Sequence, residues 1–133
     1  SPSPLRLDLQ PGTTVPAHSC ASCKLFLSKM PKDKRHALLA QTKMAALTPN
    51  TLTDIDELDA ELERINVRNV SIDNEEFVLG ITCIAVPIFD DKQNCIAAIA
   101  MHGQVATTPL TVSLSFIPRL QTAAQELAKT FGF

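Results

Sequence analysis

Two cysteines with C-x-x-C spacing are the first residues in the chain whose types and spacing could support chemistry. Cys20 and Cys23 lie in the stretch PAHSCASCKLFL, residues 16–27, shortly after His18. Thiolates and imidazoles at such spacing can bind a metal ion, and a thiol pair can act as a redox couple. A structural zinc site normally needs four ligands, however, and no second C-x-x-C follows. Two small apolar side chains on a buried helix face are therefore the third interpretation of this pair.

The residues after Ser19 predict a helix, because apolar residues recur there at helical spacing. The apolar side of this helix consists of Cys20, Cys23, Leu27 and Met30. We therefore expect both thiols to face the core. The first N–H groups of a helix have no partner inside it and carry a partial positive charge. The start of this helix could therefore bind a small carboxylate.

Length and composition limit the classes of protein to which the chain can belong. It has 133 residues, 45% hydrophobic and 20% charged, which indicates a folded domain rather than a disordered chain. We expect one domain over residues 1–133. The net charge of -2 argues against direct nucleic-acid binding. The apolar runs at 81–89 and 95–101 are much shorter than the roughly 20 residues of a membrane helix, so we expect no membrane partner.

Hydrophobic periodicity predicts an α+β domain, in which a strand, three helices, an antiparallel sheet segment and a final helix follow one another. The expected helices begin at Ser19, span 32–41, follow a cap at Thr53, and run between 120 and 131. The expected strands are 5–9, a short strand within 69–80, 81–89 and 95–102. The four cysteines are too few for a secreted disulfide scaffold, so we expect reduced thiols and a cytoplasmic location.

The chain resembles the effector-binding domain of IclR-type bacterial transcriptional regulators. The similar segments are PGTTVPAHSCASCKLFLSKMP, LTPNTLTDIDELDAELERINVRNVSIDNEEFVLGITCIAVPIFDDKQNCIAAIAMHG and IPRLQTAAQELAKTF. The most specific features are His18 with Lys24 six residues later, the E-E-x-x-x-G-x-x-C-x-A-x-P run at 75–87, and the hairpin after it. The resemblance covers nearly the whole chain in order.

This resemblance implies a GAF/PAS-like fold, a curved antiparallel sheet flanked by helices with a small-molecule pocket on one face. It implies a ligand-sensing domain of a homodimeric or homotetrameric regulator, without catalysis or a cofactor, that binds a small organic or aromatic acid. DNA would be bound only through a separate N-terminal winged helix-turn-helix domain, which this chain lacks. The family's effector domain usually begins some tens of residues earlier, so we expect its N-terminal part to be absent from this chain.

Seven ligand-binding residues follow when the family's pocket is carried over position by position. They are Ala21, Ser22 and Cys23 at the helix start, Asp73 in the acidic loop, Cys83 on the first long strand, and Ala100 and His102 on the second. Ala100 and His102 occupy positions where well-matched members have two hydroxyl residues. Cys23 replaces the family's glycine before the lysine. The pocket implied here therefore differs in chemistry from one with two serines.

The register of the hairpin decides whether His102 can belong to this pocket, because a slip of one residue reverses the face of every side chain. Pairing of Phe89 with Asn94 would place His102 on the same face as the strand thiol Cys83. Pairing of Phe89 with Cys95 would remove His102 from that face.

A thiol-based metal or redox sensor is the alternative function. In it, zinc or another soft cation would be bound by Cys23, Cys83, His102 and Asp73. A small hydrolase has little support, since the sequence contains no nucleophile elbow and no glycine-rich phosphate loop. We expect His18 to be structural, and Lys24 either to extend outward or to pair with an acid.

Overall fold

The computed structural model describes residues 16–133, and the predicted strand at 5–9 lies outside the described residues. Its helices are α1 (Ala21–Ser28), α2 (Lys32–Ala40), α3 (Ile55–Arg68), α4 (Leu110–Leu114) and α5 (Ile117–Thr130). Its strands are β1 (Ser71–Asn74), β2 (Ile81–Phe89) and β3 (Cys95–Gln104). The predicted α+β class is confirmed. The short helix α4 was not predicted.

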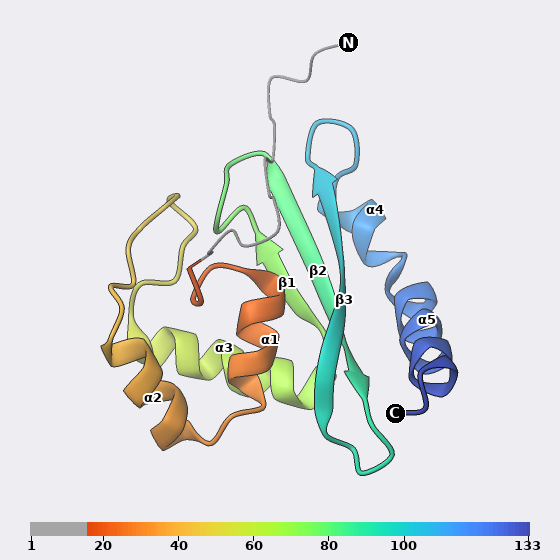
Figure 1. The fold of residues 1–133 in the computed structure, drawn as a ribbon. Coiled ribbons are helices and arrows are strands. Elements are labelled where there is room, and N and C mark those ends of the chain that lie inside the picture. The colour runs from red at the N-terminus through yellow and green to blue at the C-terminus, as the bar shows by residue number, and fades with distance from the viewer. Residues whose placement is uncertain (1–15) are drawn as a thin grey trace.

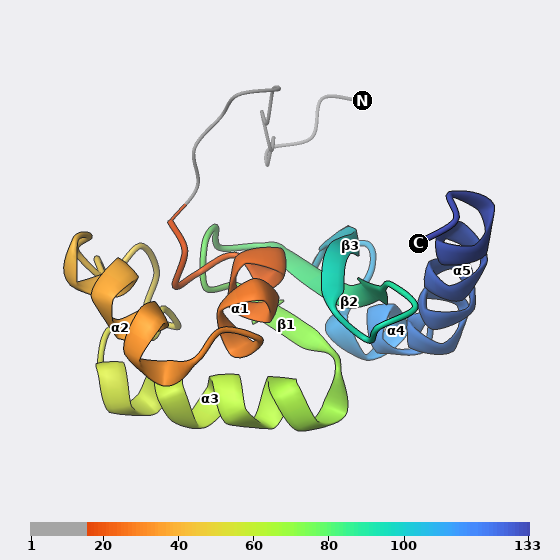
Figure 2. The same ribbon diagram turned by 60° about the horizontal axis from the view of Figure 1, so that its bottom comes forward.

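The three strands form one antiparallel sheet in the order β1-β2-β3, with helices on both faces (Figure 1). The helix α1 covers one face and packs against α3, whereas α4 and α5 lie on the other face (Figure 2). Every residue from 81 to 88 on the central strand β2 is buried, as expected for a strand covered on both sides. β3 is an edge strand among the described residues, and its side chains are half-buried or exposed.

The helix α3 forms as its apolar spacing predicts, although its first turn is capped one residue later than expected. Leu58, Leu62 and Ile65 are fully buried. The N-cap is Asp54 rather than Thr53, and its carboxylate accepts from the N–H groups of the second and third helical residues at 2.7 and 3.2 Å. Aspartate is among the best N-cap residues because its side-chain oxygen satisfies these free N–H groups.

The rotation of α1 differs from the prediction. Its buried residues are Ala21, Lys24, Leu25, Leu27 and Ser28, whereas Cys20 and Cys23 are only half-buried. The expectation that both thiols face the core is therefore wrong. A charged side chain on the buried face explains the error, because a pattern of apolar residues does not predict that a lysine points inward.

The hairpin contains a β-bulge that the predicted registers did not include. Phe89 pairs with Cys95, the second of the two registers considered from the sequence, but the register shifts between Ile88 and Phe89. A bulge adds one residue to one strand, so every pair beyond it is moved on by one residue. This shift returns His102 to the face of the sheet on which Cys83 lies. Cys83 consequently pairs directly with His102, and both side chains belong to the face covered by α1.

A buried acid attaches α2 to α3. Asp59 of α3 accepts hydrogen bonds from Arg35 Nε at 3.0 Å and lies 2.6 Å from His36 Nε2, and both partners belong to α2. Burial alone would raise the pKa of the Asp59 carboxyl, but the hydrogen bonds and charges of these two partners outweigh it and hold this pKa below its usual value. The ionised acid is therefore the form that stabilises the fold.

We expect Asp59→Asn to lower the free energy of unfolding by about 3 kcal/mol at neutral pH, because Arg35 would remain buried without its counter-charge. Urea unfolding measures this loss. Since the pKa of Asp59 is lower in the folded state, its contribution is complete above pH about 4 and disappears as the pH falls through the folded value. Glu63→Gln on the exposed side of α3 is the matched control. Equal losses in the two variants would contradict this role of Asp59.

Candidate functional site

One row of side chains crosses all three strands on the face that α1 covers. Asp73 on β1 pairs with Cys83 on β2, which in turn pairs with His102 on β3. Asp73 and Cys83 are 4% and 3% exposed, whereas His102 is exposed. Ala100 lies on the same face, opposite Ala85, and is also exposed. The sheet therefore brings the four predicted strand residues together.

The start of α1 lies close to this row. α1 packs on all three strands, with Ala21 fully buried and Ser22 and Cys23 half-buried. Burial is the main reason why the pKa of the Cys83 thiol rises to about 12, and the negative charges of Cys20 and Asp73 add to this rise. The sulfur of the N-cap residue Cys20 lies 3.4 Å from Ser22 Oγ but makes no capping hydrogen bond to the backbone of α1. The first N–H groups of α1 are thus not capped by this side chain.

The thiols do not form a metal site. Within residues 16–133, no group of three or more histidine, cysteine or acidic side chains could hold a metal ion. The Cys23 thiol hydrogen-bonds to the Cys20 sulfur, which lowers the pKa of Cys20 and raises that of Cys23. All four cysteines are free. The alternative of a metal or redox sensor built on Cys23, Cys83, His102 and Asp73 is therefore not supported.

Asp73 is a buried acid whose pKa is raised. Its Oδ1 accepts a hydrogen bond from the Glu76 N–H at 2.7 Å. Burial is the main reason why the pKa of Asp73 rises to about 6, and the nearby negative charge of Glu76 adds to it while Lys24 opposes it. Near neutral pH, part of the protein therefore carries a protonated Asp73 that can donate a hydrogen bond.

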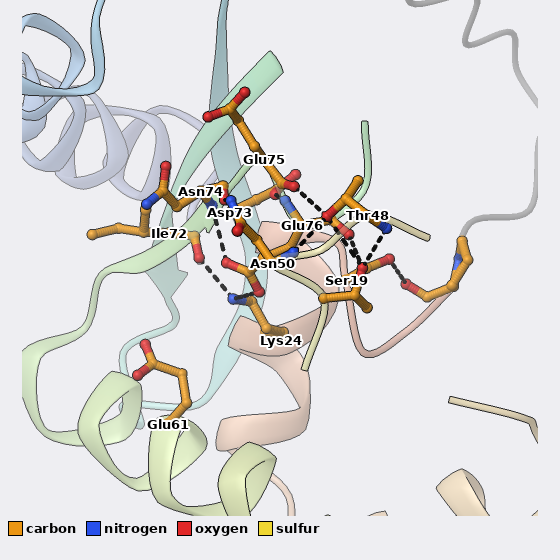
Figure 3. A network of polar contacts seen from close by, with 12 residues as sticks. Ser19, Lys24, Thr48, Asn50, Glu61, Ile72, Asp73, Asn74, Glu75 and Glu76 are labelled. Atoms are coloured by element: carbon orange, nitrogen blue, oxygen red, sulfur yellow. Dashed lines mark hydrogen bonds and ion pairs between the residues drawn. The ribbon is translucent and has the colours of Figure 1, made fainter. Parts of the chain in front are cut away.

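A buried ion pair between Lys24 and Glu76, which the sequence only partly indicated, joins α1 to the acidic turn at residues 73–76 (Figure 3). Lys24 is 1% exposed, and its Nζ donates to Glu76 Oε1 and to the Ile72 carbonyl oxygen, each at 2.7 Å. The second oxygen of Glu76 accepts from the Asn74 N–H at 2.9 Å. Of the two expectations for Lys24, pairing with an acid is confirmed. Glu76 was not identified as its partner, although it belongs to the E-E-x-x-x-G run that carried the resemblance.

His18 also has a structural environment. It is 2% exposed, and its Nε2 lies 2.8 Å from the carbonyl oxygen of Ala45. This contact attaches the segment before α1 to the loop after α2. The expectation that His18 is structural agrees with this position.

Two cavities of the described residues lie outside the predicted site. One of about 670 Å³ lies between α5 and the β2–β3 turn, and one of about 350 Å³ lies beside β1. The smaller cavity is lined by Lys24, Asn50, Leu52, Glu61, Arg68, Ile72, Asn74 and Glu76. None of the seven predicted residues lines either of them. The predicted site is instead open to solvent at β3, through the exposed residues Ala100 and His102.

Comparison with known proteins identifies the family. The family of bacterial transcriptional regulator IclR C-terminal domains matches residues 1–129. The chain belongs to the IclR family. A probable transcriptional regulator SauR from Cupriavidus necator is 37% identical over 128 residues, which cover 96% of this chain and 51% of that protein. The transcriptional repressor AllR of Escherichia coli K12 is 33% identical over 92 residues, 69% of this chain and 34% of AllR. The chain thus spans about half or less of the length of these IclR-family relatives.

Solved IclR-family structures share the fold. Transcriptional regulator YaiJ superposes with a TM-score of 0.86 at 27% identity, covering 97% of this chain and 72% of YaiJ. The Thermotoga maritima IclR structure superposes with a TM-score of 0.81 at 31% identity, covering 98% of this chain and 52% of that chain. The inducer-binding domain of PobR from Acinetobacter superposes with a TM-score of 0.82 at 27% identity, covering 88% of this chain and 69% of that chain. That structure is a double mutant in complex with 3-hydroxybenzoic acid. The expected family and effector-domain fold are confirmed. Within residues 16–133, the helices are too short or too polar to span a membrane.

We expect Lys24→Met to lower the free energy of unfolding by about 3 kcal/mol, because it leaves the Glu76 carboxylate buried without a counter-charge. Adding Glu76→Gln should recover part of this loss, since the neutral amide can remain buried at lower cost. Urea unfolding of the single and double variants measures both effects. Lys34→Met, at an exposed position of α2, is the control. The ion pair is not a main determinant of stability if Lys24→Met costs no more than this control.

Proposed function

We propose that this chain is the ligand-sensing domain of an IclR-type regulator, and that it binds a small organic or aromatic acid at the start of α1. The observation that supports this proposal most is the row Asp73–Cys83–His102 on the sheet face beneath the start of α1. The acid would change operator affinity by favouring one arrangement of a homodimer or homotetramer. DNA contact would belong to a separate domain, and the protein would act in the cytoplasm by binding rather than by catalysis.

The acid's carboxylate would meet the N–H groups of Ala21, Ser22 and Cys23, where the helix dipole favours negative charge. Asp73 and His102 would fix its orientation from opposite ends of the row, with the Cys83 thiol between them. The exposed position of Ala100 provides the entry, and its small side chain leaves room for an apolar group of the acid. The PobR domain with 3-hydroxybenzoic acid supports an acid as the class of effector.

Protonation of Asp73 would be coupled to binding. An ionised Asp73 repels a carboxylate, whereas the neutral acid can donate a hydrogen bond to it. The pKa of Asp73, raised to about 6 mainly by burial, leaves the carboxyl mostly ionised at higher pH. A proton taken up at Asp73 would therefore accompany the effector.

We expect at least one acid among acetate, pyruvate, benzoate and 3-hydroxybenzoate to raise the melting temperature of the full-length protein. A ligand at a concentration of 100 times its Kd stabilises the folded state by about 2.7 kcal/mol, which thermal-shift measurements resolve. Ala100→Trp should abolish the shift by filling the entry. Asp91→Asn, in the exposed β2–β3 turn, should leave it unchanged. If none of the four acids stabilises the protein, the proposed effector class is wrong.

We also expect the affinity for the acid to fall as the pH rises above about 6, by up to about tenfold per pH unit, because binding takes up a proton. Calorimetric titration across the pH range measures this dependence. Asp73→Asn should flatten it, since an amide does not titrate. His102→Gln is the companion variant that separates the contribution of this side chain from that of Asp73. A dependence unchanged by Asp73→Asn would exclude Asp73 as the titrating group.

A further inference from the structure

The loop between α2 and α3, residues 48–51, supports the acidic turn, residues 73–76, with side-chain hydrogen bonds (Figure 3). Three consecutive carbonyl oxygens of the turn accept them. The donors are Thr48 Oγ1 to Glu75 O at 2.6 Å, Asn50 Nδ2 to Asn74 O at 3.0 Å, and Thr51 Oγ1 to Glu76 O at 2.6 Å. The paired residues are 24 to 27 positions apart in the sequence, so these are tertiary contacts.

Thr51 is the centre of this contact. Its hydroxyl oxygen accepts from the N–H groups of Leu47 and Thr48 at 3.1 and 2.9 Å, which fixes the 48–51 loop itself. Its proton is then donated to the carbonyl oxygen of Glu76. A hydroxyl has one proton and two lone pairs, so Thr51 uses its full hydrogen-bonding capacity. A single side chain thus orders the loop and connects it to the acidic turn.

The acidic turn has a conformation that its own residues do not favour. Glu75 adopts a φ of 56°, in the left-handed region where side chains with a Cβ are disfavoured. This turn directs the Glu76 N–H to Asp73 Oδ1 at 2.7 Å. Hydrogen bonds from outside the turn therefore help to hold it in this conformation.

We propose that the 48–51 loop is the positioning element of the effector site and that Thr51 acts on Asp73 through Glu76. This inference rests on the proposed binding of an acid beside Asp73. Thr51 would not contact the acid. It holds Glu76, whose N–H orients the Asp73 carboxyl and whose carboxylate is anchored to Lys24 of α1. Asp73 and the start of α1 are thereby held in fixed positions relative to each other, although they belong to separate elements.

A positioning role and a general structural role predict different measurements. Loss of a merely structural hydrogen bond changes the free energy of unfolding but leaves the affinity of the folded protein for an acid unchanged. Loss of positioning weakens affinity at temperatures where the variant is fully folded. It also requires the Asp73 carboxyl, because Thr51 acts only through that group.

The test measures the Kd of whichever of acetate, pyruvate, benzoate and 3-hydroxybenzoate stabilises the full-length protein most, well below the melting temperature. Thr51→Val, which keeps the shape and removes the hydroxyl, should weaken binding about tenfold, the effect of one well-placed hydrogen bond. Thr51→Ser should restore most of the affinity. In an Asp73→Ala background, Thr51→Val should have little further effect.

Thr42→Val is the matched control, because among the described residues the Thr42 hydroxyl bonds to Leu39 O at the end of α2 and to no residue of the acidic turn. It should leave the Kd unchanged. If the wild-type protein binds none of the four acids, the proposed function fails and this inference fails with it. If the wild-type protein binds and Thr51→Val binds equally well, only the positioning role is overturned. Equal losses of affinity on Thr51→Val with and without the Asp73 carboxyl would also overturn it. If Asp73→Ala does not fold, the affinities of Thr51→Val, Thr51→Ser and Thr42→Val decide the question.

Discussion

The buried ion pair between Lys24 and Glu76 is the interaction on which the arrangement of this domain depends. An ammonium group that is 1% exposed cannot remain charged without a partner, because its desolvation costs several kcal/mol. α1 can therefore pack with Lys24 inward only where Glu76 reaches it. This requirement fixes the rotation of α1, turns Cys23 partly outward, and brings the helix start to the Asp73 side of the sheet.

Among the described residues, β1 has no strand partner on the side away from β2, and the same lysine helps to cover this edge. Exposed strand edges carry unpaired carbonyl groups and invite pairing with other chains. Here, alternate carbonyls of this edge accept from side chains: Val70 O from Arg68 Nε, Ile72 O from Lys24 Nζ, and Asn74 O from Asn50 Nδ2. The four-residue strand is thus held between its partner β2 and a row of donors. Such fixation suits a strand that carries Asp73, the acid proposed to orient the effector.

The β-bulge opposite Ile88 and Phe89 decides which residues of β3 lie on the same face as Cys83. Beyond it, odd-numbered residues of β2 such as Cys83 lie towards α1, and even-numbered residues such as Ile84 pack in the apolar cluster beneath α5. The row proposed to bind the acid and the core that supports it therefore alternate along one strand. A slip of one residue would exchange them, which gives the register a functional consequence.

The sequence by itself determined the α+β class, the family, the long hairpin strands and the apolar face of α3, because these depend on local periodicity and on motifs along the chain. It also indicated which seven residues to examine. Only the tertiary structure decided which face of α1 is buried, that Glu76 is the partner of Lys24, and that a bulge sets Cys83 opposite His102. The loop that supports Asp73 was likewise not predicted. Each of these depends on contacts between residues far apart in sequence, where the cost of an unpaired buried charge or carbonyl outweighs local preference.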